Sequence, residues 1–340
     1  MSRIYTVAAD GSGDFTAIQD ALNTEDGDVV IKLKPGLYKG QIFSAKKRLK
    51  ILGEDPEKTV ISGNIGAKDI HPDGYKTGTF RSFTAYFAGD SVFLENLTIE
   101  NTAGQGTDVG QAVALYASAS YVYCKNLKIL GHQDTLFTAP LPEKERIPGG
   151  FKGPEENSVR KPSLQCYEDC FISGTVDFIF GSADVLFKNC TVCVRDSSTE
   201  CYITAPSSFK DGTGYIFDGC TIVTESEDGR AVRDNPNKNS GDSSMQRKNV
   251  YLGRPWREFA KCCWMNCDLS DVICDEAWDN WRNAENEKTC RFSVYKNKWN
   301  RNGEGGLGGF AHSLSGEEAY EMTRKAKDIQ LKVIAACRLP

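Results

Sequence analysis

A short repeat constrains the fold of this chain more than any other feature of its sequence. Each copy is an apolar or aromatic strand, a tight turn at Asn, Asp or Gly, and a second, alternating strand. The clearest copies occupy residues 92–99, 122–129, 185–192 and 215–222, and looser copies occupy residues 165–172 and 262–269. Their starts are roughly 20 to 50 residues apart, which is the spacing of a solenoid whose loops vary in length.

The repeat explains the asparagines and many of the cysteines. Asparagine tolerates left-handed backbone geometry and hydrogen-bonds locally, so we expect it at the turns. The turn asparagines are Asn96, Asn126, Asn189 and Asn266. The next position of each copy takes a small or apolar residue, namely Leu97, Leu127, Cys170, Cys190, Cys220 or Cys267. Cysteine behaves here as a small buried hydrophobe, and equivalent inward residues stacked coil on coil are expected in a parallel β-helix.

These patterns predict an all-β fold, a parallel β-helix (solenoid) with short N-terminal and C-terminal helices. Strands with almost no helix between them argue against a barrel of β/α units. A β-sandwich is the alternative, but it does not predict the fixed internal phase of the repeat.

The whole chain, residues 1–340, is predicted to form a single domain. Residues 140–162 are rich in Pro, Gly, Lys and Glu and are expected to form an insertion loop beside the site. Residues 225–247 are polar and suggest a second exposed loop. A C-terminal helix is expected at about 315–336, where Ser315 can cap it and acidic residues precede lysines.

Composition limits the possible partners and compartments. The net charge of -5 argues against nucleic acid or an anionic membrane as partner, and no apolar run is long enough to span a membrane. The 13 scattered cysteines fit neither a disulfide framework nor a zinc site. Residues 1–5 lack the apolar core of a secretory signal, so a cytoplasmic protein is expected; the alternative is a secreted protein whose leader has been removed.

Four polar residues stand within apolar, strand-forming segments. They are Gln111, Gln133, Asp134 and Asp177, in residues 111–115, 131–137 and 174–181. Burying a carboxylate among such residues is costly unless a partner compensates it, and the best cation is Arg254, in residues 252–256. A catalytic site is therefore a better interpretation than packing, although turn-capping aspartates and a glutamine ladder are possible in a β-helix.

The residue types indicate acid–base or nucleophilic chemistry. Beside Arg254, Asp177 would be ionised and able to act as nucleophile, base or metal ligand. Asp134, without its own cation, is freer to hold a proton and act as an acid. Gln111 and Gln133 can donate amide N–H groups to a developing oxyanion. No Gly-x-Ser-x-Gly elbow is present, which disfavours a serine hydrolase.

The same segments carry a resemblance to a known family. The sequence resembles pectin methylesterases (pectinesterases) from residue 7 to about residue 298. The matching motifs are Thr79-Phe-Arg-Ser82, Gln111-Ala-Val-Ala-Leu115, Gly131-His-Gln-Asp-Thr-Leu136, Gly174-Thr-Val-Asp-Phe-Ile-Phe-Gly181 and Leu252-Gly-Arg-Pro-Trp256. This resemblance implies a single-stranded right-handed parallel β-helix and an aspartyl esterase that hydrolyses galacturonate methyl esters, releasing methanol.

The resemblance also implies a role for each residue. Asp177 would attack the ester carbonyl, Asp134 would be the general acid and then base, and Arg254 would orient Asp177. Gln111 and Gln133 would form the oxyanion hole. Aromatic residues that would bind the sugar rings are Trp256, Phe137, Phe180, Phe80 and Trp281.

The implied partners are methyl-esterified homogalacturonan or oligogalacturonides. No metal or other cofactor is expected, neither nucleic acid nor a membrane is an expected partner, and the family is mostly monomeric. The insertion at 140–162 is longer than the corresponding connection in plant members.

Two other functions remain open at this stage. One is another β-helix enzyme active on pectin. A polygalacturonase would need carboxylates that flank a glycosidic bond, and a pectate lyase would need clustered acids for calcium and a basic side chain. Neither enzyme needs the paired glutamines. A non-catalytic carbohydrate-binding solenoid would not depend on Asp177.

Overall fold

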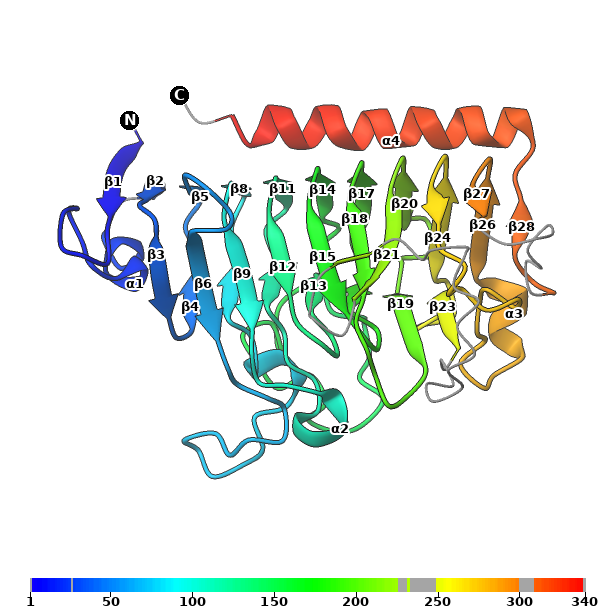
Figure 1. Ribbon diagram of the computed structural model, residues 1–340, viewed down its shortest axis with the longest axis horizontal. Coiled ribbons are helices and arrows are strands. Elements are labelled where there is room, and N and C mark those ends of the chain that lie inside the picture. The colour runs from blue at the N-terminus through cyan, green and yellow to red at the C-terminus, as the bar shows by residue number, and fades with distance from the viewer. Residues whose placement is uncertain (1, 26, 226–230, 233–248, 300–308, 339–340) are drawn as a thin grey trace.

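The computed structural model describes residues 2–25, 27–225, 231–232, 249–299 and 309–338. Within these residues, the chain winds into coils that each contribute a strand to three long sheets (Figure 1). All pairs between named strands are parallel except one, in which β22 (Ala231–Val232) runs antiparallel to β21. The predicted right-handed parallel β-helix is confirmed.

The three sheets take their strands from successive coils. The first sheet contains β1 (Arg3–Val7), β2 (Asp28–Leu33), β5 (Arg48–Leu52), β8 (Ser91–Glu95), β11 (Tyr121–Lys125), β14 (Leu164–Glu168), β17 (Asp184–Lys188), β20 (Tyr215–Asp218), β24 (Lys261–Met265), β26 (Arg291–Tyr295) and β28 (His312–Ser313). The second contains β3 (Gly36–Lys39), β6 (Thr59–Gly63), β9 (Thr98–Asn101), β12 (Lys128–Leu130), β15 (Phe171–Gly174), β18 (Thr191–Val194), β21 (Thr221–Glu225), β25 (Asp268–Leu269) and β27 (Lys298–Trp299), with β22 beside β21. The third contains β4 (Ile42–Ser44), β7 (Ala85–Phe87), β10 (Leu115–Ala117), β13 (Leu136–Thr138), β16 (Ile179–Gly181), β19 (Cys201–Pro206) and β23 (Val250–Gly253).

The repeat corresponds to the corner between the first and second sheets. All four predicted turn asparagines have positive φ, between 50° and 58°. Asn126 Nδ2 also donates a hydrogen bond of 2.8 Å to Asn96 Oδ1 on the preceding coil. The cysteines that follow such turns are buried in the main apolar core with Leu97 and Leu127. The prediction for these turns and inward positions is confirmed.

The helices of the described residues are few and lie outside the coils of the solenoid. In the described part of the chain they are α1 (Ile18–Leu22), α2 (Gly106–Val109), α3 (Glu285–Thr289), α4 (Gly316–Ala336) and a 3-10 turn, η1 (Thr79–Arg81). The N-terminal helix is short, as predicted, but the C-terminal helix is not, because α4 has 21 residues. None of the described helices is long and apolar enough to cross a bilayer.

Helix α4 covers the first sheet (Figure 1). Ser315 caps it as expected, since Ser315 Oγ accepts from Glu318 N and the Glu318 side chain accepts from Ser315 N. Its buried face carries Ala326, Ile329 and Val333, which pack on outward residues of the first sheet. The helix therefore buries apolar side chains that the sheet would otherwise expose.

The insertion at residues 140–162 lies over the third sheet. Its Phe151 is buried in the cluster of aromatic residues on the outer face of this sheet. Glu155 Oε1 accepts hydrogen bonds from Tyr86 Oη (2.6 Å) and Ser118 Oγ (2.7 Å). The segment is therefore packed against the outer face of the third sheet. Most of the second predicted loop, at 225–247, falls outside the described residues.

Candidate active site

The polar residues singled out in the sequence lie next to the ends of strands in the third sheet. Gln111, Gln133, Asp134 and Asp177 each stand a few residues before a strand of that sheet, whereas Arg254 follows β23. Asp134 N donates to Val176 O (3.0 Å), and Ala112 N donates to Gln133 O (3.0 Å). Stacking of neighbouring coils therefore brings together residues that are far apart in sequence.

Asp177 and Arg254 form a two-pronged ion pair. Arg254 Nε donates to Asp177 Oδ1 at 2.8 Å, and Nη2 donates to Oδ2 at 2.7 Å. Both side chains are largely buried. A fork of this kind fixes the orientation of the carboxylate as well as its charge. The predicted contact between the two residues is present.

Two aromatic rings hold the guanidinium of Arg254. Its Cζ lies 3.7 Å from the ring centre of Tyr202 and 3.9 Å from that of Trp281. Such stacking restricts the guanidinium and favours its charge. Tyr202 was not singled out in the sequence. Its position one coil after the segment that contains Asp177 is the signal that could have identified it, because Tyr202 N donates to Thr175 O at 3.1 Å.

The two carboxyl groups have different electrostatic surroundings. Burial, followed by the charge of Asp177, raises the pKa of Asp134 well above its ordinary value. The Arg254 charge and a hydrogen bond from the Gln133 side chain oppose this rise. Asp134 is therefore the group better suited to hold a proton.

Burial also raises the pKa of Asp177, and Arg254 lowers it in opposition. The neighbouring charge of Arg254, taken alone, predicts a lowered pKa for Asp177 and hence the ionised state expected from the sequence. That expectation was wrong in its net direction, because only 7% of Asp177 is exposed and desolvation disfavours its charged form. The two carboxyl groups still differ in their surroundings, since only Asp177 is hydrogen-bonded through both oxygens to an arginine.

Both aspartates adopt left-handed backbone conformations. φ is 63° at Asp134 and 50° at Asp177. Non-glycine residues in this region carry a modest energetic cost, and such residues are concentrated at functional sites.

The two glutamines lie in different surroundings. Gln133 packs against α2, where a Cβ on Gly106 would come within 2.3 Å of Gln133 Oε1. Glycine at position 106 therefore leaves the space that the Gln133 side chain occupies. The Gln111 side chain is half-buried and makes no hydrogen bond to any other residue described in the structure. Its amide is available to a bound ligand.

The predicted sugar-binding aromatics form one cluster but are not equally accessible. Phe137 is 0% exposed and packs beneath Phe80 and Phe180, with ring centres 5.0 and 4.8 Å away. Phe80 and Phe180 are each 3% exposed. Trp256 and Trp281 are only partly buried. Direct contact with a sugar is therefore open to the two tryptophans, whereas Phe137 supports the others from below.

No group of three or more His, Cys, Asp or Glu side chains within the described ranges is placed to hold a metal ion. All 13 cysteines are unpaired. The sequence-based expectation that no cofactor is needed stays a prediction.

The fold and the site together define a right-handed parallel β-helix protein with an aspartate pair, an arginine and two glutamines beside its third sheet. The Pectinesterase family model matches residues 4–141 and 158–321. The chain belongs to the pectinesterase family.

Individual relatives agree with the family match. Pectinesterase 31 of Arabidopsis thaliana is 31% identical over 307 residues, which cover 87% of this chain and 82% of that protein. The match to three Arabidopsis pectinesterase/pectinesterase inhibitor proteins spans only 35%, 46% and 39% of their lengths.

Solved structures show the same fold. Pectin methylesterase from carrot superposes with a TM-score of 0.76 at 25% identity, covering 99% of this chain and 96% of that chain. A pectin methylesterase in complex with a hexasaccharide superposes with a TM-score of 0.70 at 25% identity, covering 94% and 96%.

Proposed function

We propose that this protein hydrolyses methyl esters of galacturonate units in pectin or oligogalacturonides, giving methanol and a free carboxylate. The observation that carries the proposal is the forked ion pair between Asp177 and Arg254 beside Asp134, whose pKa is raised. Membership of the pectinesterase family and the likeness to a hexasaccharide-bound pectin methylesterase support a pectin-type substrate.

In the first half-reaction, an Asp177 carboxylate oxygen bonds to the ester carbonyl carbon. The carbonyl oxygen becomes an oxyanion, which the amides of Gln111 and Gln133 stabilise by donating hydrogen bonds. The tetrahedral intermediate collapses, the carbon–methoxy bond breaks, and Asp134 gives its proton to the departing methoxide. The products are methanol and an acyl-enzyme on Asp177.

In the second half-reaction, Asp134 is ionised and takes a proton from water. The hydroxide oxygen bonds to the acyl carbon, the bond to Asp177 breaks, and Asp177 leaves as a carboxylate held by Arg254. Asp134 is protonated again, so the enzyme returns to its starting state.

The experiment measures methanol release from highly methyl-esterified pectin while the viscosity of the polymer is followed. The wild type is expected to release methanol at steady viscosity, and Asp177→Asn to release none while folding normally. Asp169→Asn is the matched control, because Asp169 also has a positive φ of 55° but is exposed at a turn of another corner.

Falling viscosity without methanol would instead indicate cleavage of the polysaccharide backbone, as in a polygalacturonase or lyase. If neither pectin nor methylated oligogalacturonides release methanol, a binding-only solenoid is the better explanation. Full activity in Asp177→Asn would reject the proposed nucleophile.

A further inference from the structure

The two aspartates of the site belong to segments with the same pattern, Gly-x-x-Asp. The Asp134 turn begins at Gly131, and the Asp177 turn begins at Gly174. These turns start where β12 and β15 end, and the two strands are neighbours in the second sheet. Equivalent residues of the two turns therefore lie on adjacent coils.

The two turns are hydrogen-bonded directly to each other. Thr175 N donates to His132 O at 2.9 Å, and Asp134 N donates to Val176 O at 3.0 Å. A Cβ on Gly174 would lie 2.6 Å from His132 O, so glycine leaves the room that this contact needs. The separation of the two carboxyl groups therefore depends on how one turn lies against the other.

Arg195 binds both turns from the following coil. It comes directly after β18, which pairs with β15. Its backbone N–H donates to Gly174 O at 2.9 Å, and its Nη1 donates to Gly131 O at 3.1 Å. The side chain thus extends past the Asp177 turn to the Asp134 turn. Both contacts are to the glycine that begins a turn, so one arginine holds the two turns together.

Glu225 orients the side chain of Arg195. Glu225 ends β21, the next strand after β18 in the second sheet, and its Oε2 accepts from Arg195 Nε at 3.0 Å. His132 and Cys193 also face this ion pair. Burial, followed by the Arg195 charge, lowers the pKa of His132 to about 4, and burial raises the pKa of Cys193 to about 12. Both groups are therefore uncharged at neutral pH and do not compete for the ion pair.

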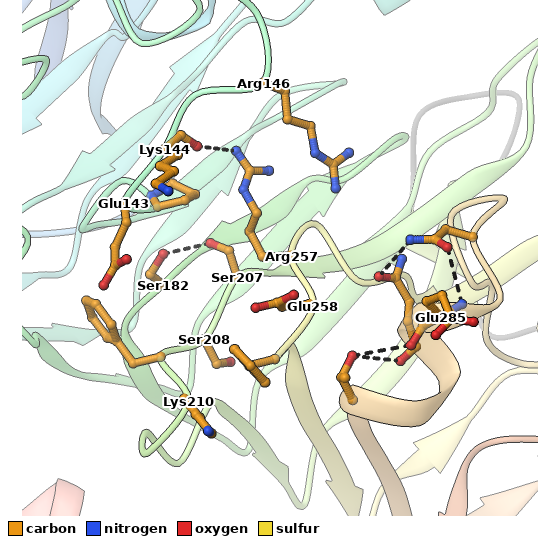
Figure 2. A pocket seen from close by; sticks show the side chains of 16 residues that line it. Glu143, Lys144, Arg146, Ser182, Ser207, Ser208, Lys210, Arg257, Glu258 and Glu285 are labelled. Atoms are coloured by element: carbon orange, nitrogen blue, oxygen red, sulfur yellow. Dashed lines mark hydrogen bonds between the residues drawn. The ribbon is translucent and has the colours of Figure 1, made fainter.

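The other arginines around the site make different contacts. Arg146 and Arg257 line a pocket of about 780 Å³ beside the insertion (Figure 2). Both donate to Trp256 O, at 2.7 and 2.8 Å. Arg254 binds the carboxylate of the nucleophile itself. Arg195 instead binds the backbone that carries both carboxyl groups, so it acts through their positions.

We propose that Arg195 is a positioning residue for the esterase reaction, which fastens the Asp134 turn to the Asp177 turn while Glu225 holds it in place. Asp134 must lie within hydrogen-bond reach of the methoxy oxygen of the intermediate formed on Asp177, so a small shift between the turns slows proton transfer. This inference rests on the proposed function for the identity of the reaction.

The pKa of Asp134 depends on the same arrangement. Burial and the charge of Asp177 raise this pKa, and the Arg254 charge opposes the rise. Loosening the Asp134 turn would expose its carboxyl group to water and move it away from Asp177. Removal of Arg195 should therefore lower the pKa of Asp134.

The first test is methanol release from highly methyl-esterified pectin across pH. Arg195→Gln is expected to lower kcat by about 10- to 100-fold, with KM within about twofold of the wild type. The basic limb of the kcat/KM profile, where Asp134 loses its proton, should move to lower pH. Arg48→Gln is the matched control, because Arg48 also pairs with a carboxylate on a neighbouring coil, that of Asp28, but lies in the N-terminal coils.

The second test does not depend on turnover. Asp134→Asn is expected to raise the free energy of unfolding at pH 7, because it removes a buried charge. The gain should be smaller in a protein that also carries Arg195→Gln, since the carboxyl group is less buried there. Urea unfolding of the wild type, the two single variants and the double variant measures this difference.

An equal gain in both backgrounds, an unmoved basic limb, a loss confined to KM, or an equal loss in Arg48→Gln would overturn the inference. If Arg195→Gln does not fold, Glu225→Gln decides, because it keeps the arginine and removes the carboxylate that orients it. Glu225→Gln should shift the basic limb and reduce the gain in the same directions. If the wild type releases no methanol, the esterase is rejected, and the unfolding measurements alone decide on Arg195.

Discussion

Asp134 and Asp177 are similarly buried, at 8% and 7% exposure, but only Asp177 has a cation bound to both oxygens. One carboxyl group is thereby suited to attack as an anion and the other to donate a proton. Separation of two pKa values by their surroundings is a common way to obtain acid and base from the same residue type.

Removing Arg254 is expected to shift the pH dependence of activity. Asp177 must be ionised to attack, and without Arg254 burial alone raises its pKa further. In Arg254→Gln the acidic limb of the kcat/KM profile therefore moves to higher pH, and activity at neutral pH falls by roughly 100-fold. The measurement is methanol release across pH, with Arg324→Gln as control, because Arg324 is exposed on α4 and pairs with Glu321 of the same helix. If the acidic limb does not move in Arg254→Gln, then Arg254 does not control the ionisation of Asp177.

Asp134 is expected to reduce stability at neutral pH. The pKa of Asp134 is higher in the folded protein than in the unfolded chain, where it is about 3.9. Below that pH the carboxyl group is protonated in both states and no stability is lost. As the pH rises from there toward the folded pKa, ionisation favours the unfolded chain and the free energy of unfolding falls. Asp134→Asn removes the charge and should raise the free energy of unfolding at pH 7 by about 1 kcal/mol or more. The gain should vanish near pH 3. Urea unfolding at both pH values measures it, and an equal gain at both would contradict the electrostatic cause.

At the scale of elements, the corner turns hold the coils in phase. Asn126 has a φ of 50° and bonds to Asn96 on the coil before it. Asn126→Ala should lower the free energy of unfolding by about 1–2 kcal/mol, because alanine is disfavoured in left-handed geometry. Asn126→Gly should cost less, since glycine adopts this conformation freely. Equal costs for the two variants in urea unfolding would show that the lost side-chain bond, and not the backbone, dominates.

At the scale of the whole molecule, the insertion is attached to a solenoid that is complete without it. None of the strands in the three sheets lies within residues 142–157. Replacing residues 143–156 by a short Gly-Ser linker should keep the β-sheet circular dichroism. The thermal midpoint should fall by about 2 to 4 °C, because buried Phe151 is lost. Loss of the native spectrum would mean that the insertion is part of the folding unit.

Local sequence patterns predicted the architecture, and they singled out Asp177 and Arg254, which the structure brings into contact. Strand alternation, left-handed turn residues and one inward position recur at fixed phase, and each is a local property that a sequence displays directly. These residues stood out because amides and carboxylates in apolar, strand-forming segments are costly to bury unless they are hydrogen-bonded or paired.

Only the tertiary structure decided how those residues act. Tyr202 beside Arg254, the burial of Phe137, the net rise in the pKa of Asp177 and the joining of Arg146 to Trp256 all depend on which coils stack together. Desolvation and stacking are sums over neighbours that lie tens of residues apart in the chain. A local pattern shows which residue types are present, but their distances and exposure are set by the packing of the whole solenoid.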